Sequence, residues 1–423
     1  MLDTRSVFWI FVAILLLCSC VSASQAPPSL LHVPQDYDTI QAAIDAAGGG
    51  TEIIVGMGTY VENVNFNGED IILRSTDPDD PQVVSATIID GDGKGGTVTF
   101  QSGETDKAQL LGFTITGGSG NAYLRATADG EIQTCRKGVF DTQEVKRYCG
   151  GGIVVEGGAE PIIEKNVIRG NGVTHSGGGI FVGKGACPTI RRNTITDNGA
   201  TGGGGIYVVE GAAPTIEGNV IKGNDAQFGG GVLADWGADP TLTGNTIQGN
   251  TGESGGGLCV FNYARATVLE NTISGNRASG GGGGIFAGPE TLLTIRDNRI
   301  TENTAGFGGG VYIELDAVLV VENNIISDNV AWLSGGGVDA SGALDTEIRA
   351  NTFEGNESRR GGGLYIPEDV DIIVEDNVFR SNSADNGGAI WTPASSAQEQ
   401  REGNTFNHNR PDDVYAREAD KSE

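Results

Sequence analysis

Basic residues are scarce in this sequence. Lys and Arg number 27 against 55 Asp and Glu, which gives a formal net charge of −28 over 423 residues. The phosphates of nucleic acids and anionic lipids are bound by clusters of Lys and Arg that neutralise them. The charge balance therefore argues against nucleic acid and anionic membrane surfaces as partners, and it is compatible with divalent cations.

Proline is also scarce, with 13 residues, whereas glycine is abundant, with 69. A collagen would combine glycine at every third position with much proline, and neither feature is present. A flexible linker would lack the apolar residues that make up 38% of this chain. A glycine-rich chain with enough apolar residues for a core directs attention to internal repeats.

Long apolar runs are missing as well, so no transmembrane segment is expected in the mature chain. The run at residues 7–17, which follows Arg5, has the length of a signal-peptide core, and we expect residues 1–23 to be a signal peptide. Two cleavage chemistries remain open. Val21-Ser22-Ala23 suits ordinary signal peptidase, whereas Leu17-Cys18-Ser19-Cys20 resembles a lipobox with Cys20 as the lipidated residue. The protein is expected to be secreted or associated with the cell envelope, with a lipid anchor in the second case.

Glycine runs divide the body of the chain into units of regular length. The last glycine of each run recurs at intervals of 25 to 27 residues. These positions are Gly152, Gly179, Gly205, Gly231, Gly257, Gly284, Gly310, Gly337, Gly363 and Gly388. Such a period is typical of a solenoid in which each repeat stacks on its neighbours.

Asparagine pairs five residues apart recur in step with the glycines. The ten pairs occupy positions 166/171, 193/198, 219/224, 245/250, 271/276, 298/303, 324/329, 351/356, 377/382 and 404/409. Each pair encloses an apolar residue, from Ile168 to Phe406. One unit thus contains three short strands, and we expect the Asn side chains to stack at the turns and bond along the axis.

The predicted fold is all-β, a right-handed parallel β-helix with three sheets and about 12–13 rungs. After the signal peptide we expect a linker and a short N-terminal capping helix at 24–50, with Ile40, Ala43, Ile44 and Ala47 on one face. Irregular first rungs follow at 51–119, an inserted loop at 120–149, ten regular rungs at 150–410 and a charged tail at 411–423.

The N-terminal residues carry a family resemblance. Residues 33–45, including Thr39-Ile40-Gln41-Ala42-Ala43-Ile44-Asp45, and then Gly58-Thr59-Tyr60-Val61-Glu62-Asn63 resemble the cap and first rung of the pectate-lyase-like β-helix superfamily. That superfamily includes pectate lyases, pectin esterases and many uncharacterised bacterial proteins. Later units, such as Phe379-Arg380-Ser381-Asn382 followed by Gly387-Gly388-Ala389-Ile390, resemble repeats of chlamydial polymorphic outer-membrane proteins, which are adhesins. The resemblance is specific for fold and weak for activity.

Cysteine and histidine form no recognisable metal motif. Cys135 and Cys149 bracket the inserted loop and are expected to form a disulfide in an oxidising compartment. Cys187 and Cys259 lie nearly three rungs apart, too far to bridge at roughly 4.8 Å per rung. We expect them to be lone buried thiols.

The strand after each glycine run alternates inward and outward positions. Its middle residue is Asp339 in one rung, and an unpaired carboxylate is not tolerated in a dry core, so the middle position is expected to face outward. Six of the ten middle residues are aromatic, namely Phe181, Tyr207, Phe286, Tyr312, Tyr365 and Trp391. Rings spaced by roughly 4.8 Å match the length of a sugar unit, which predicts a stripe that binds an extended polysaccharide. The alternative is that these rings only stabilise the sheet by cross-strand stacking.

A second candidate site lies near the ends of the same strands. In pectate lyases, which this fold resembles, carboxylates there hold Ca²⁺ and an Arg or Lys removes the proton beside the uronate carboxyl. The matching residue types here are Lys184 as a possible base and Glu156, Glu210 and Asp235 as possible Ca²⁺ ligands. The alternative is a solvated run of charges. Motifs of pectin esterases and polygalacturonases are missing from the sequence.

Three functions remain open at this stage. The favoured one is a monomeric, exported protein that binds a polysaccharide or cell-surface glycan without catalysis. The second is a polysaccharide lyase of the pectate type, and the third is a cell-surface adhesin or structural protein.

Overall fold

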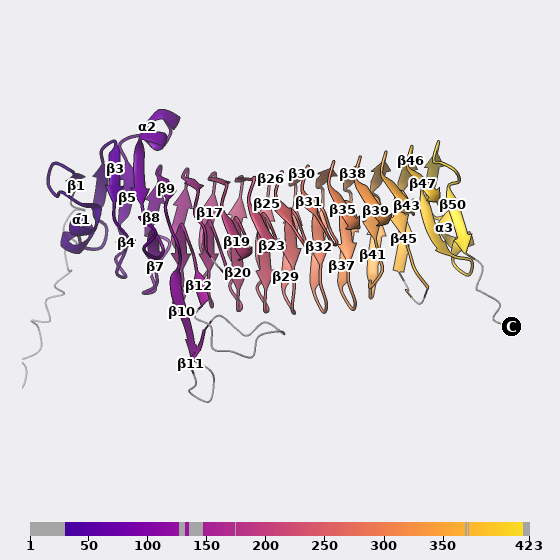
Figure 1. The fold of residues 1–423 in the computed structure, drawn as a ribbon, viewed down its shortest axis with the longest axis horizontal. Helices are drawn as coiled ribbons and strands as arrows, with labels where there is room; N and C mark the ends of the chain where they lie inside the picture. The colour runs from indigo at the N-terminus through magenta and orange to yellow at the C-terminus, as the bar shows by residue number, and fades with distance from the viewer. Residues whose placement is uncertain are drawn as a thin grey trace, which may run out of the picture.

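The computed structural model describes residues 30–126, 132–134, 147–173, 175–368, 370 and 372–417. Its strands stack side by side along one long axis, as Figure 1 shows, and three sheets of 13 parallel strands run the length of the stack. This architecture confirms the predicted parallel β-helix. A fourth parallel sheet, of eight strands, accompanies the regular rungs and was not predicted.

Sheet C holds the strands that follow the glycine runs. Its strands are β4 (Val64–Asn65), β7 (Val98–Phe100), β13 (Ile153–Val155), β16 (Ile180–Val182), β20 (Ile206–Val209), β24 (Val232–Asp235), β28 (Leu258–Val260), β32 (Ile285–Ala287), β36 (Val311–Ile313), β40 (Val338–Asp339), β44 (Leu364–Tyr365), β48 (Ile390–Pro393) and β50 (Val414–Arg417).

Sheet A comes next along each rung. Its strands are β1 (Leu30–Val33), β2 (Glu52–Val55), β5 (Ile72–Ser75), β8 (Gln109–Leu111), β14 (Ile162–Glu164), β17 (Thr189–Arg191), β21 (Thr215–Glu217), β25 (Thr241–Thr243), β29 (Arg265–Leu269), β33 (Leu292–Arg296), β37 (Val318–Glu322), β41 (Thr346–Arg349) and β45 (Ile372–Glu375).

Sheet B lies between the two Asn positions of each rung. Its strands are β3 (Gly58–Val61), β6 (Thr87–Asp90), β9 (Thr114–Thr116), β15 (Val167–Arg169), β18 (Thr194–Thr196), β22 (Val220–Lys222), β26 (Thr246–Gln248), β30 (Thr272–Ser274), β34 (Arg299–Thr301), β38 (Ile325–Ser327), β42 (Thr352–Glu354), β46 (Val378–Arg380) and β49 (Thr405–Asn407).

Sheet D, the unexpected one, fills the segment between the second Asn and the next glycine run. Its strands are β19 (Gly199–Gly202), β23 (Asp225–Phe228), β27 (Thr251–Gly252), β31 (Arg277–Ala278), β35 (Thr304–Phe307), β39 (Val330–Ser334), β43 (Glu357–Arg360) and β47 (Ser383–Asn386).

The two Asn columns bond along the axis as predicted. Asn276 is typical: its Nδ2 donates to Asn303 Oδ1 at 3.0 Å and to the Ile247 carbonyl at 2.9 Å, and its backbone N–H donates to the same Asn303 oxygen. Every rung donates toward the next one in the C-terminal direction. One column ends on Asn404 and the other on Asn409, whose Nδ2 donates to the Asp413 carboxylate. A buried amide without a hydrogen-bond partner destabilises the folded state, so any shift in register that breaks these bonds is unfavourable. The bonds therefore fix the register between rungs.

The interior is a continuous apolar column. Residues such as Ile195, Ile221 and Ile247 from sheet B are fully buried, and Phe353 and Phe379 stack at 4.6 Å between ring centroids where phenylalanine replaces isoleucine. The predicted capping helix exists as α1 (Ile40–Ala46), which buries Ile40, Ala43 and Ile44 at the N-terminal end of the solenoid (Figure 1). Its first backbone N–H groups donate to the Glu62 carboxylate.

Smaller elements decorate the solenoid. Helix α2 (Pro81–Ala86) lies before β6, and α3 (Ala397–Glu402) contacts β50 at the C-terminal end. The predicted insertion contains an antiparallel sheet of β10 (Asn121–Ala126), β11 (Ile132–Thr134) and β12 (Arg147–Cys149), which projects from the body in Figure 1. Among the described residues, no helix is long and apolar enough to cross a membrane.

Candidate functional site

The sheet C strands split their side chains between two apolar regions. In β16 the first and third residues, Ile180 and Val182, belong to the interior column. The middle residue, Phe181, belongs to a separate cluster that also contains Tyr207, Leu233 and Phe286, and we call this the outer cluster. The middle position therefore points away from the interior, as predicted.

The outer cluster nevertheless corrects the expectation of an exposed aromatic stripe. Phe181 is 1% exposed, Tyr207 9%, Phe286 5% and Trp391 4%. Phe228 at the end of sheet D and Trp236 and Phe261 beyond sheet C pack against the cluster. Only Tyr312 and Tyr365 among the predicted rings are partly exposed.

The burial follows from a sharp corner between sheets D and C. Gly203, the second glycine of its run, has a φ of +62°, and a Cβ built there would lie 2.7 Å from Tyr207 Cβ. Side chains of sheet D contact outer residues of sheet C at this corner: Phe228 packs against the outer cluster, and the Phe307 ring lies 5.8 Å from the Tyr312 ring. Glycine is required because any larger residue would enter this corner. The insertion is joined to this corner by backbone pairing, because Cys149 forms an isolated parallel β-bridge with Ser176.

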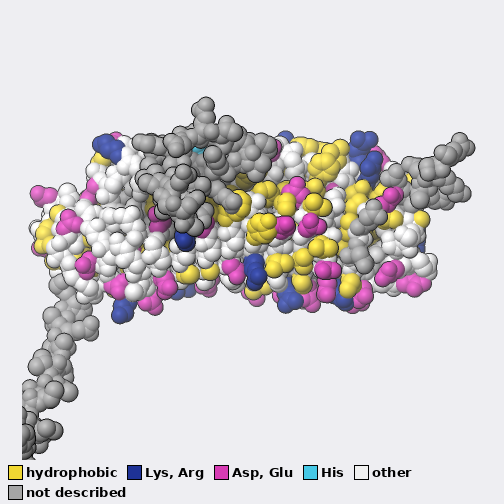
Figure 2. Space-filling model, turned by 90° about the horizontal axis from the view of Figure 1, so that it is seen from below, with side chains coloured by type: hydrophobic (Ala, Val, Ile, Leu, Met, Phe, Trp, Pro, Cys, Tyr) yellow, Lys and Arg dark blue, Asp and Glu magenta, His cyan; other side chains and the backbone are white. Residues whose placement is uncertain are grey.

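Rings of adjacent rungs contact one another along the corner. Centroid distances are 5.7 Å for Phe181–Tyr207, 5.5 Å for Phe286–Tyr312 and 4.8 Å for Tyr365–Trp391. The view in Figure 2, from the side on which the β10–β11 hairpin projects, shows hydrophobic side chains interspersed with acidic ones on the surface. The column of rings is interrupted at Leu233 and Cys259, which are apolar, and again between Tyr312 and Tyr365, where the middle residue is Asp339.

Asp339 is fully buried and bonded on both carboxylate oxygens. Ser334 Oγ donates to Oδ2 at 2.5 Å, while the backbone N–H of Ser341, at 3.0 Å, and the Ser341 hydroxyl donate to Oδ1. Burial raises the pKa of Asp339 to about 6, and the bonds from the two serines oppose that rise. Sequence reasoning placed this carboxylate outside the core correctly but did not foresee that its partners would bury it.

A cavity of about 210 Å³ opens above these serines at the corner. It is lined by Phe307, Leu333, Ser334, Ser341, Arg359, Arg360 and Tyr365. Three successive rungs contribute, because Phe307 lies one rung before Asp339 and Tyr365 one rung after it. Phe307 and Leu333 are 37% and 41% exposed. Apart from Tyr365, no lining residue was predicted, and Asp339 among aromatic residues was the only sequence signal for this place.

The predicted lyase cluster lies near the other end of the corner. Glu156 has its side chain over Gly183 of the next rung, where a Cβ would meet Glu156 Cγ at 2.9 Å. Burial, and then the charge of Glu210, raise the pKa of Glu156 to about 7. Asp235 accepts bonds from Tyr207 Oη at 3.0 Å and from Asn262 Nδ2 at 2.8 Å, and Lys184 is exposed.

The charge of Glu210 therefore acts on Glu156, whereas Asp235 is hydrogen-bonded to Tyr207 and Asn262. Across the residues that the structure describes, no group of three or more His, Cys, Asp or Glu side chains is arranged to hold a metal ion. The Ca²⁺ site and the role of Lys184 stay predictions.

The cysteines fall into three situations. Cys149 is disulfide-bonded, and its predicted partner Cys135 lies outside the described residues, as does the possible lipidation site Cys20. Cys259 is a free buried thiol as expected, with its pKa raised chiefly by burial. Cys187 is free but exposed, which corrects the expectation of burial, because it lies in the turn between β16 and β17.

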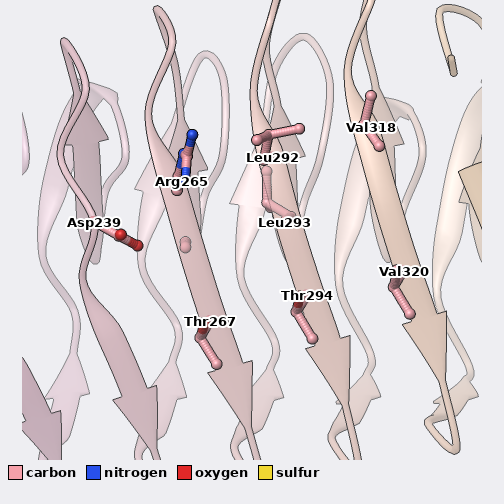
Figure 3. Close-up of a pocket in the computed structure, with 9 residues that line it drawn as sticks. Asp239, Arg265, Thr267, Leu292, Leu293, Thr294, Val318 and Val320 are labelled. Carbon is pink, nitrogen blue, oxygen red and sulfur yellow. The ribbon is translucent and has the colours of Figure 1, made fainter. Parts of the chain in front are cut away.

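A second, shallower depression of about 350 Å³ crosses the outer face of sheet A. Figure 3 shows Thr267, Thr294 and Val320 in one row across β29, β33 and β37, with Arg265, Leu292 and Val318 in a second row. These residues alternate with interior ones along each strand. No motif or spacing in the sequence marks this face in advance.

A protein-family model agrees with the fold. The model of the right handed beta helix region matches residues 95–271, 179–353 and 272–420. A solved structure described as the complex of XylC with xylose is 12% identical, with a TM-score of 0.45 over 90% of this chain and 86% of that one. The receptor binding domain of the Siphovirus 9NA tailspike is 8% identical, with a TM-score of 0.21 over 85% and 77% of the two chains. No curated protein matches the chain.

Proposed function

We propose, from the premise that this chain belongs to the right-handed beta helix family, that it is an exported protein that binds an extended polysaccharide or cell-surface glycan without cleaving it. The binding surface is the corner between sheets C and D in the C-terminal third of the solenoid, from Phe307 to Tyr365. The remainder of the aromatic column, including Phe181, Tyr207 and Phe286, is structural because it is buried.

One observation carries this proposal. At the Asp339 rung, partly exposed rings and oriented hydroxyl groups meet in a single cavity. Carbohydrates present both apolar C–H faces and hydroxyl groups, so their sites combine aromatic rings with polar groups that fix orientation. Rung spacing of roughly 4.8 Å also repeats the binding surface at about the length of a sugar unit.

Two further features support the proposal. The cavity has Arg359 and Arg360 at its edge, in a chain whose formal charge is −28. Arg359 is 3.7 Å from Asp385, an exposed pair that contributes little to stability and leaves its guanidinium accessible. Absence of catalysis is proposed because the sequence lacks the motifs of pectin esterases and polygalacturonases.

The test is binding of the purified mature protein to an array of immobilised polysaccharides. Tyr365→Ala removes a ring that lines the cavity and should weaken binding about ten-fold, which corresponds to ~1.4 kcal/mol. Leu292→Ala is the control, since it removes an exposed apolar side chain of sheet A outside the corner. Unchanged binding by a folded Tyr365→Ala protein would contradict the proposal.

A second candidate, a pectate-type lyase, is favoured by the Glu156 carboxyl, which titrates near neutral pH beside Glu210. A group with such a pKa can exchange protons with a substrate under physiological conditions. The test is formation of unsaturated product from a panel of uronans with Ca²⁺. Product formation that disappears in both Glu156→Gln and Lys184→Ala would establish the lyase, whereas no product from any uronan would remove it.

A further inference from the structure

The interruption of the aromatic column at Asp339 has the shape and chemistry of a subsite. We propose that it holds one sugar ring, a terminal or branch unit, through hydroxyl protons that the ligand donates to Ser334 and Ser341. This inference rests on the proposed glycan binding and specifies which part of the glycan is recognised.

The walls of the subsite are aromatic and two rungs apart. Phe307 lies on the rung before Asp339, 5.8 Å from Tyr312, and Tyr365 lies on the rung after it, stacked on Trp391. Two rungs correspond to roughly 9–10 Å, and stacked partners need roughly 4.5 Å or more on each side. One ring fits between the walls. The cavity of about 210 Å³ is likewise smaller than the roughly 300–1,000 Å³ of sites for larger ligands.

The floor has a fixed hydrogen-bonding polarity. A serine hydroxyl has one proton, and both Ser334 and Ser341 donate theirs to the Asp339 carboxylate. What remains on each Oγ is acceptor capacity, so a ligand must bring donors. Sugar hydroxyl groups are such donors. Arg359 and Arg360 at the edge supply the opposite polarity, because guanidinium groups only donate and thus bond to ring or substituent oxygens.

The geometry also determines how a polymer enters. A ring between Phe307 and Tyr365 is closed on both sides along the solenoid axis and closed below by the serines. The remaining lining residues, Leu333, Arg359 and Arg360, are exposed, so a polymer attached to this ring continues outward past them. An internal sugar unit of a linear polymer is linked to a neighbour on both sides, whereas a terminal or branch unit is linked on one side. A cavity with one exit therefore suits a terminal or branch unit.

The polarity of the floor depends on the charge of Asp339. The neighbouring strands place Tyr312 and Tyr365 on either side of this carboxylate, the charge of Glu314 acts on Tyr312, and sheet D adds Arg359 and Arg360 to the cavity lining. When Asp339 takes up a proton, it donates to one serine in place of accepting, and that hydroxyl turns its own proton toward the cavity. Ligand binding should therefore weaken as the pH falls through about 6, the pKa of this carboxyl.

The experiment uses methyl pyranosides of the gluco, galacto, manno and xylo configurations, with saturation-transfer NMR followed by titration. Asp339→Asn keeps the size of the side chain but replaces one acceptor oxygen with an NH2 donor. One serine hydroxyl must then accept from this NH2 group, and its own proton is free to point into the cavity. Asp328→Asn, at an exposed turn of the sheet B side, is the matched control. Ser341→Ala is a second variant, chosen in case Asp339→Asn is unstable.

The expected result is that at least one glycoside binds the wild-type and Asp328→Asn proteins. Its Kd should rise at least ten-fold in Asp339→Asn and Ser341→Ala, and should rise between pH 7.5 and pH 5 in the wild type and Asp328→Asn, which both keep Asp339 and its serines. Equal binding by folded Asp339→Asn and Ser341→Ala proteins would overturn the inference. Binding of polysaccharides on the array, sensitive to Tyr365→Ala, without any glycoside binding would overturn the subsite and leave the proposed function intact. Failure of both probes would remove both proposals.

Discussion

Replacement of a single asparagine in the middle of a column should destabilise several rungs at once. Asn276→Ala removes the acceptor of two bonds from Asn250, its backbone N–H and its Nδ2, each 3.0 Å long. It also removes the donor to the Ile247 carbonyl. Asn303 keeps the bond from the backbone N–H of residue 276 and is not counted. Three buried polar groups thus lose a partner.

The magnitude follows from that count. Asn250 Nδ2 keeps its bond to the Ile221 carbonyl. Loss of the partner of the other two groups costs about 1–3 kcal/mol each, so the variant should lose roughly 2–6 kcal/mol. Nearly all of the affected atoms are shielded from solvent, since Asn250 and Asn276 are 0% and 1% exposed. A loss of this size is a large fraction of the roughly 5–15 kcal/mol that stabilises a typical domain.

The assay is urea unfolding combined with amide hydrogen exchange, resolved by peptide. Because each rung contacts mainly its neighbours, exchange should accelerate about a hundred-fold or more in residues 245–310 and less at the two ends. Ser274→Ala, two residues away on the outward side of β30, is the control and should change stability by less than about 0.5 kcal/mol. An Asn276→Ala protein with the unfolding midpoint and exchange pattern of Ser274→Ala would refute the reasoning about the column.

Two further outcomes are expected. Gly205→Ala places a Cβ 2.5 Å from the Gly231 carbonyl oxygen and should lower the free energy of unfolding by about 3 kcal/mol. Gly237→Ala, at a φ of +72° with no atom within 4 Å of the added Cβ, should lower it by only about 1 kcal/mol. Equal melting temperatures of the two variants would contradict this difference. Because the pKa of Glu156 is raised from 4.5 to about 7 in the folded state, ionisation opposes folding as the pH rises through that range. Glu156→Gln should therefore stabilise the protein by up to about 3 kcal/mol at pH 8 and not at pH 4, as measured by urea unfolding at both pH values.

The repeating framework could be predicted because its physical causes are local. Each corner with an Asn needs a residue of the same type in every rung, since Asn276 bonds only to Asn250 and Asn303 among side chains. The glycine corner imposes an equally strict requirement, because a Cβ at Gly205 has no room. Regular spacing of these residues is therefore visible in the sequence.

The candidate site could be predicted only in part because it depends on sheet D. Strands such as Arg277–Ala278 and Glu357–Arg360 have neither alternation nor β-branched residues, so nothing marks them as strands. Alternation in sheet C separates inward from outward side chains, but it does not say whether another strand covers the outward ones. For the same reason Asp339 was placed outside the core while its partner Ser334, which ends a sheet D strand, was missed.

The side-chain amide dipoles of the two Asn columns all point the same way along the solenoid axis. Every side-chain amide in a column donates toward the C-terminal neighbour and accepts from the N-terminal one, from Asn166 to Asn404 and from Asn171 to Asn409. The amide dipoles are thus aligned head to tail, as peptide dipoles are in an α-helix, with the positive end at the last rung. Asp413 places a carboxylate on that end at 2.9 Å from Asn409 Nδ2. At the end of the column that finishes on Asn409, a carboxylate thus accepts a hydrogen bond from the terminal amide. Acidic side chains stabilise the N-terminus of an α-helix in the same way.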